Sequence, residues 1–213
     1  MPAWIYSGTI DSVTAQTLLK PAVFIASLIP TIVLIYRAFT DNLGANPIEA
    51  IRLFTGDWTL YFLLVTLTVT PLRHLTGHHG LIRYRRMLGL FAFYYAVLHV
   101  LSYIILDQFF NWHAMWLDVL KRPYITIGIA AFVLLIPLAL TSTKAMMRRF
   151  GGRWQRLHQL IYPATILGVL HYYWLVKADV RMPLIFAGLL AVLLVLRLPP
   201  AKRLILQLRQ SPA

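Results

Sequence analysis

Six apolar segments divide the chain, and short polar stretches separate them. They lie near residues 18–39, 58–72, 87–106, 123–143, 157–176 and 182–196. A helix needs about 20 apolar residues to cross the hydrocarbon core of a bilayer. The second and sixth segments are shorter, but Trp and Tyr side chains at their ends extend them into the membrane interface. The pattern predicts an all-α fold, a polytopic bundle of six transmembrane helices forming a single domain over residues 1–213.

The composition points to the same class of protein. Of the 213 residues, 59% are hydrophobic and 13% are charged, and the mean hydropathy is +0.69. Soluble domains are about 45–50% apolar and about 25% charged, and a chain of this length cannot hide the excess in one core. The chain has no cysteine, so disulfides, iron–sulfur clusters and thiolate-bound haem are excluded. We therefore expect a multi-pass membrane protein whose metal ligands are not thiolates.

The charged residues predict the topology. About 14 of the 20 Lys and Arg residues fall on one side of the predicted membrane, at residue 20 and within 73–86, 144–156 and 197–209, whereas six of the seven acidic residues fall on the other. Loops that face the cytoplasm carry the excess of Lys and Arg. Both termini are therefore predicted to be cytoplasmic. The formal charge of +13 then reflects topology and contact with membrane lipid, and no nucleic-acid partner is predicted.

Three of the seven histidines lie inside predicted spans, namely His99, His158 and His171. An ionisable side chain within a membrane is costly, so each is a candidate functional residue. His99 precedes Asp107 by eight residues, and His171 precedes Lys177 by six. The two predicted helices run in the same direction, so these two histidines are expected at a similar depth near the outer face.

Small residues precede both of these histidines at the same intervals. Ala92 and Ala96 come seven and three residues before the first, and Ala164 and Gly168 come seven and three residues before the second. These intervals place them on the histidine's own helix face. A haem clamped between two helices needs such a slot and an imidazole on each side of its iron. Small residues four apart also favour plain helix packing, so two histidines that only bridge a helix interface are the alternative.

The remaining histidines give weaker indications. His158 lies about 140° around a straight helix from His171, which leaves two interpretations: a ligand for a second haem or another cofactor, and a polar residue at headgroup level. Tyr95 and Ser102, each about one turn from His99, are candidate partners of its ring, or else an interface aromatic and a backbone-bonding hydroxyl. The other four are expected in loops: His74, His78, His79 and His113.

Two basic stretches on the predicted cytoplasmic side are candidate contacts for a phosphorylated flavin such as FMN. Arginine guanidinium groups bind phosphate with two parallel hydrogen bonds. The candidate residues are Arg83, Arg85, Arg86, Arg153, Trp154 and Arg156. The chain has no glycine-rich phosphate loop, so the pattern itself does not separate a flavin phosphate from a lipid headgroup.

Several ordered motifs together carry a resemblance to a known family. They are residues 43–47 with 54–56, then 83–90, 99–103, 122–128, 141–143, and 153–158 continuing to 171–174. In this order they closely resemble the MsrQ family (YedZ type), the haem-binding membrane subunits of bacterial periplasmic methionine-sulfoxide reductase systems. The resemblance spans nearly the whole chain.

The resemblance implies a ferric-reductase-like transmembrane domain in the bacterial inner membrane, with haem b and FMN as cofactors. It implies electron transfer from the quinone pool to a periplasmic molybdopterin subunit that reduces methionine sulfoxide in oxidised proteins, so this chain would carry electrons rather than catalyse the reduction. By position, His99, His158 and His171 fall on the family's membrane histidines. Larger ferric-reductase relatives have a fourth histidine where this chain has Arg85 and Arg86, which puts a second haem of that geometry in doubt.

Two other functions stay open at this point. One is a quinone-linked b-type cytochrome or metal-ion reductase with another partner. The other is a small transporter or membrane scaffold whose histidines bind a substrate or a proton, although transporters often show inverted repeats and broken helices that we do not see in this sequence. No dinucleotide-binding fingerprint is present, so electrons are expected from quinol or from a separate flavoprotein.

Overall fold

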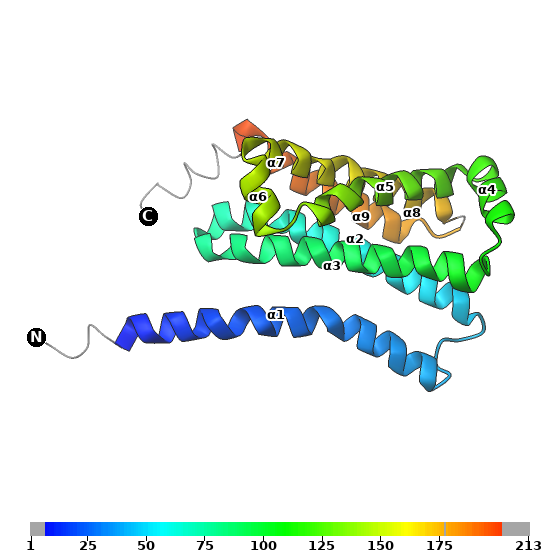
Figure 1. The fold of residues 1–213 in the computed structure, drawn as a ribbon, viewed down its shortest axis with the longest axis horizontal. Coiled ribbons are helices and arrows are strands. Elements are labelled where there is room, and N and C mark those ends of the chain that lie inside the picture. The colour runs from blue at the N-terminus through cyan, green and yellow to red at the C-terminus, as the bar shows by residue number, and fades with distance from the viewer. Residues whose placement is uncertain (1–6, 177, 202–213) are drawn as a thin grey trace, which may run out of the picture. The chain divides into compact units, whose positions relative to one another are not determined.

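The computed structural model describes residues 7–176 and 178–201, and helices are the only regular elements among them. The chain divides into two units, Met1–Gly44 and Ala45–Ala213. The first contains α1 (Ser7–Phe39). The second contains α2 (Pro47–Thr76), η2 (His79–Leu81), α3 (Ile82–Leu101), η3 (Ser102–Asp107), α4 (Trp112–Lys121), α5 (Pro123–Leu140), α6 (Lys144–Phe150), α7 (Gly152–Leu157), η4 (His158–Leu160), α8 (Ile161–Leu175) and α9 (Arg181–Val195). Figure 1 labels the α-helices among them. The all-α prediction is confirmed.

Within residues 7–176 and 178–201, four helical segments are long and apolar enough to cross a membrane. They are Leu19–Phe39, Pro47–Thr76, His79–Asp107 and Pro123–Leu140. Helices α8 and α9 have 15 residues each, which is shorter than a full span of about 20. The multi-pass membrane class therefore stands, whereas the number of six spans and the cytoplasmic termini stay predictions.

Helix α2 is twice as long as the predicted segment 58–72, because its ends are set by polar capping residues. The Asn46 side chain accepts a hydrogen bond from the backbone N–H of Glu49 at 3.3 Å, and Pro47 occupies the first turn. Both features favour the start of a helix. Gly77 ends it with a left-handed φ of 74°. The added N-terminal turns carry residues that line the functional site described below.

The second unit is built from two long helix pairs. Helix α2 packs along α3, and α5 packs along α8, while α9 contacts α8 and α2. Helix α4 lies at one end of these pairs, and α6 and α7 lie at the other (Figure 1); we name these the α4 end and the α6–α7 end. The centre of the α2–α3 pair is aromatic, with the fully buried Tyr95 ring stacked on Phe62 at 5.2 Å between centroids.

At the α4 end, the π-helix η3 continues α3, and one carboxylate of α4 bonds to residues of η3 and of the loop after it. Asp118 of α4 accepts hydrogen bonds from Tyr103 at 3.0 Å and Gln108 at 3.1 Å, and it pairs with Arg122 at 3.2 Å. The side chain of Asp118 is only 15% exposed. Short π-helical segments occur often at functional sites, and this one directly follows the helix that carries His99.

Candidate functional site

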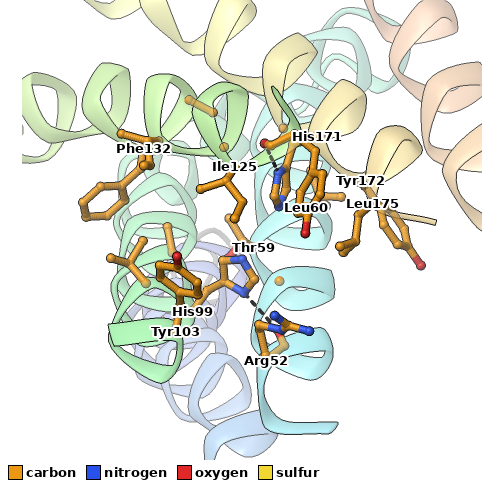
Figure 2. A pocket seen from close by; sticks show the side chains of 18 of the residues that line it. Arg52, Thr59, Leu60, His99, Tyr103, Ile125, Phe132, His171, Tyr172 and Leu175 are labelled. Carbon is orange, nitrogen blue, oxygen red and sulfur yellow. Dashed lines mark hydrogen bonds between the residues drawn. The ribbon is translucent and has the colours of Figure 1, made fainter. Parts of the chain in front are cut away.

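The second unit contains a cavity of about 330 Å³ toward its α4 end. Side chains from α2, α3, α4, α5 and α8 line it, and most are apolar. His99 and His171 line it from α3 and α8 (Figure 2). The other polar groups in its wall include Arg52, Asp57 and Tyr103. An apolar cavity with a few converging polar groups is typical of a cofactor or ligand site.

Each cavity histidine is held by one backbone carbonyl. The Nδ1–H of His99 donates to the carbonyl oxygen of Arg52 at 2.9 Å, and that of His171 donates to the carbonyl oxygen of Tyr124 at 2.7 Å (Figure 2). A carbonyl can only accept, so Nδ1 carries the proton in each ring and Nε2 keeps its lone pair. Such a bond fixes the tautomer and orientation of a metal-binding imidazole.

The separation of the two rings fits a metal ion held between them. Their centroids are 6.1 Å apart and their planes are inclined at 76°. Two imidazole nitrogens bonded at about 2 Å on opposite sides of a metal would place the ring centroids about 6 Å apart. The pair therefore has the spacing that the two axial ligands of a haem iron need.

The predicted slot of small residues largely lies in the cavity wall. Ala96, Ala164 and Gly168 line the cavity, whereas Ala92 is completely buried and is not among the lining residues. A Cβ added at Gly168 would lie 3.2 Å from the Leu60 side chain. Three of the four small residues thus make room beside the histidines, and the fourth packs in the core.

The two halves of the site repeat each other at an offset of 72 residues. The hydrogen bonds of His99 and His171 to their carbonyls both span 47 residues. Four residues after each carbonyl is a glycine, Gly56 or Gly128, which faces the histidine ring. A Cβ on Gly56 would lie 3.1 Å from its ring, and a Cβ on Gly128 would lie 2.8 Å from its ring. The helix pairs α2–α3 and α5–α8 therefore present their histidines in the same way.

His158 lies at the α6–α7 end, away from the two cavity histidines. The hydroxyl of Thr141 donates its proton to the Pro137 carbonyl at 2.6 Å, so it accepts from Nε2 of His158 at 3.1 Å. The Trp154 ring stacks on His158 at 3.8 Å between centroids, and its Nε1–H donates to the Thr141 carbonyl at 2.9 Å. The structure thus gives His158 partners of its own.

Comparison with known proteins identifies the family. The model of the ferric reductase like transmembrane component matches residues 55–169, which is more than half of the chain. A protein of Rhodospirillum rubrum named "Protein-methionine-sulfoxide reductase heme-binding subunit MsrQ" is 57% identical over 183 residues, covering 85% of this chain and 88% of the relative. Proteins of the same name from Herminiimonas arsenicoxydans and Xanthomonas oryzae pv. oryzae are 55% and 50% identical, over 85% of this chain and 84% and 86% of the relatives. The chain belongs to the MsrQ family.

Within this MsrQ-family chain, the partner that holds Nδ1–H of the His99 ring is neither of the two sequence-based candidates. The Ser102 hydroxyl donates to the backbone carbonyl of His99 at 2.7 Å, and Tyr95 stacks in the aromatic core. The partner is the carbonyl of Arg52, which sequence reasoning missed because residue 52 lies outside the predicted span 58–72. Every residue has a backbone carbonyl, so the sequence does not single out the one that bonds a histidine. The glycine that follows four residues later in both halves is the signal that could have located it.

The basic residues proposed as FMN contacts do not share one environment in this MsrQ-family chain. Arg83, Arg86, Arg153 and Arg156 are exposed, whereas Arg85 and Trp154 are half-buried. The structure therefore stacks Trp154 on His158, keeps Arg85 half-buried and leaves the other four at the surface.

Two histidines expected in loops are helical instead. His74 lies in the last turns of α2, which runs to Thr76, and His113 lies in α4. The loop predictions were wrong because α2 extends beyond its apolar segment and because α4, a helix of ten residues, was not predicted. His78 and His79 lie at the start of the short turn η2.

Proposed function

We propose that His99 and His171 are the axial ligands of one b-type haem and that the chain transfers electrons through it. The observation that carries the proposal is the matched pair of imidazoles, 6.1 Å apart, each with its Nδ1 proton on a backbone carbonyl. The relatives are named heme-binding subunits, which supports the same cofactor. When bound, haem supplies an iron that accepts and releases one electron.

The chain's own residues would hold the haem and set its surroundings. The carbonyls of Arg52 and Tyr124 keep the two rings in the tautomer that leaves Nε2 available. Ala96, Ala164 and Gly168 leave space between the helices. The mainly apolar wall keeps water from the site, and polarity of this kind tunes the reduction potential of a haem.

The proposed electron acceptor is a periplasmic molybdopterin subunit that reduces methionine sulfoxide in oxidised proteins. The name of the relatives describes a subunit of a protein-methionine-sulfoxide reductase, and the cavity lies toward the α4 end, which the distribution of basic residues predicts to face outward. The chain would therefore serve as the electron-transfer subunit, with sulfoxide reduction on the partner. Six spans, cytoplasmic termini and one ferric-reductase-like domain in the bacterial inner membrane belong to this proposal.

On the cytoplasmic side, the proposed source of electrons is the quinone pool, with FMN as a second carrier. One haem near the outer face leaves much of a hydrocarbon core of roughly 30 Å uncrossed. A carrier at the α6–α7 end would shorten that distance. The half-buried Arg85, Trp154 and His158 are the residues there that support a flavin or another cofactor.

The test is a reduced-minus-oxidised optical spectrum of the detergent-purified protein, with haem quantified per chain. We expect about one haem with a bis-imidazole spectrum, and its loss in both His99→Ala and His171→Ala. His113→Ala is the matched control, since this histidine lies exposed on α4. A bis-imidazole spectrum retained in both cavity variants contradicts the ligand assignment, and colourless wild-type protein contradicts haem binding.

The partner is tested separately. Reduced haem in the full membrane protein should be reoxidised when methionine sulfoxide and the periplasmic reductase subunit are both added. Reoxidation by the same subunit without sulfoxide, at an equal rate, would favour a cytochrome with another acceptor.

A further inference from the structure

The α6–α7 end of the second unit is strongly basic and has no carboxylate to balance it. The chain contains no Asp or Glu in residues 58–106, 119–178 or 180–213. Among the described residues, the ion pairs Arg52–Asp107, Arg122–Asp118 and Arg181–Asp179 all involve residues at the starts and ends of helices at the α4 end. The arginines at the α6–α7 end thus have no protein anion beside them in the described part of the chain.

Three of these arginines converge from different helices. Arg85 lies in the first turns of α3, Arg73 lies near the end of α2 and Arg197 follows α9, so all three stand at the α6–α7 end. Arg197 donates from Nη1 to the Tyr162 hydroxyl at 2.8 Å, and its guanidinium lies 5.3 Å from the centre of that ring. Like charges at one end of a bundle repel, and an anion bound among them would offset that repulsion.

Arg197 also keeps one donor free. Its Nη2 bonds the backbone carbonyl of Leu67, while its Nε is buried and has no hydrogen-bond partner among the described residues. A buried N–H of a charged group that bonds nothing costs free energy. An acceptor from outside the protein at Nε would remove that cost.

The neighbouring face of α2 offers two more free donors. The hydroxyls of Thr66 and Thr70 are buried, and no residue that the structure describes forms a hydrogen bond with them. Other threonines of the same helix bond the carbonyl four residues before them: Thr55, Thr59, Thr68 and Thr76. Thr66 and Thr70 are therefore exceptions to the usual bonding of threonine in a helix, and their spacing of four puts them on one face with Arg73.

Packing brings this face of α2 against Arg85. The Thr66 methyl group lies 3.7 Å from the position that a Cβ on Gly89 would take. Gly89 lies four residues after Arg85 on α3, so the two share a face of that helix. Since α2 and α3 are antiparallel neighbours joined by residues 77–81, Arg85 lies beside the Thr70 and Arg73 end of the α2 face.

We propose that Arg73, Arg85 and Arg197, with the hydroxyls of Thr66 and Thr70, bind a phosphate ester at the junction of α2, α3, α8 and α9. Guanidinium groups and hydroxyls donate to phosphate oxygens, and Nε of Arg197 and the two threonine hydroxyls are available as donors. Basic pockets between membrane helices on the cytoplasmic side bind anionic headgroups. The phosphate of an anionic phospholipid and that of a flavin mononucleotide share this chemistry, and the experiment separates the two. The inference does not depend on haem binding.

The experiment uses the purified full-length protein in detergent, with two probes. The first is phosphatidylglycerol added against phosphatidylcholine, read as the shift in the thermal unfolding midpoint. The second is FMN, read by quenching of its fluorescence. Arg85→Gln and Arg197→Gln should weaken binding of the phosphate probe about tenfold, and Thr70→Val should weaken it about threefold with an unchanged haem spectrum.

Matched controls keep the test specific. Arg148→Gln removes an exposed cation of α6 at the same end, and Thr68→Val removes a hydroxyl that already bonds the Leu64 carbonyl; both should bind like wild type. Selective stabilisation by phosphatidylglycerol identifies a lipid, and quenching of FMN that the same variants lose identifies a flavin. If Arg197→Gln does not fold, binding of the phosphate probe by Thr70→Val becomes the deciding measurement. Binding of neither probe, or equal binding by wild type, Arg85→Gln and Thr70→Val, overturns the proposal.

Discussion

The helix pairs α2–α3 and α5–α8 are alike at one end and different at the other. At the α4 end, both hold a histidine by a carbonyl 47 residues earlier and place a glycine against its ring. At the α6–α7 end, the same offset of 72 residues matches His158 with Arg86. Only the α5–α8 half therefore has a histidine at this matched position.

The surroundings of His158 differ between the halves as well. Its partners Thr141 and Trp154 correspond, at the same offset, to Val69 and Ile82. Neither of these side chains can form a hydrogen bond or an aromatic stack. The two helix pairs are thus alike at the α4 end, where we propose that their histidines bind one haem together. They differ around His158 at the α6–α7 end, where we propose no ligand shared between them.

The largest effect on haem affinity is expected from a substitution at Gly128, in the half of the site where the glycine lies closer to the histidine ring. A Cβ on Gly128 would lie 2.8 Å from Nδ1 of His171 and 2.9 Å from Cε1, so Gly128→Ala must displace the ring from the Tyr124 carbonyl. Overpacking of this kind costs about 1–3 kcal/mol. Haem titration of the apoprotein should show affinity reduced roughly tenfold to a hundredfold.

The corresponding change in the other half should be milder. A Cβ on Gly56 would lie 3.1 Å from Cε1 of His99, a contact that a small shift of the ring relieves. We expect Gly56→Ala to lower haem affinity about fivefold, at the low end of overpacking costs, about 1 kcal/mol. Gly188→Ala is the control, because nothing lies within 4 Å of its added Cβ. Equal losses in the two halves would show that the tightness of the glycine contact does not matter.

The connection between the two halves should contribute to stability. Asp118 accepts hydrogen bonds from Tyr103 and Gln108 and pairs with Arg122. Asp118→Asn should lower the free energy of unfolding by about 2 kcal/mol, because bonds to a largely buried charge are lost. Thermal unfolding in detergent measures this. Asp179→Asn, at a pair in which both side chains are more than half exposed, should change little.

The smallest effect on haem is expected where the halves differ. His158→Ala removes a hydrogen bond to Thr141 and a stack on Trp154, which should cost about 1 kcal/mol of stability. Haem per chain and the bis-imidazole spectrum should stay as in wild type. A fall from two haems to one, measured in the same preparation, would instead make His158 an iron ligand.

Much of the architecture can be predicted from the sequence, because a membrane requires apolar segments and basic loops, and both are properties of the local sequence. The depth of His99 and His171 and the matched small residues before them follow from counting along predicted helices. The start of α2 was placed too late, since its first turns are polar and its boundary depends on the caps Asn46 and Gly77. That error hid the turn that contains Arg52 and Gly56.

What the sequence by itself determined was therefore the class of fold and the pair of histidines, which depend on hydropathy and helical periodicity. Only the tertiary structure decided how those histidines are held. The carbonyls of Arg52 and Tyr124 belong to helices packed alongside, and a backbone oxygen is the same in every residue. The tautomer of each ring and the separation of 6.1 Å arise from helix packing, which brings together residues 47 and 72 positions apart.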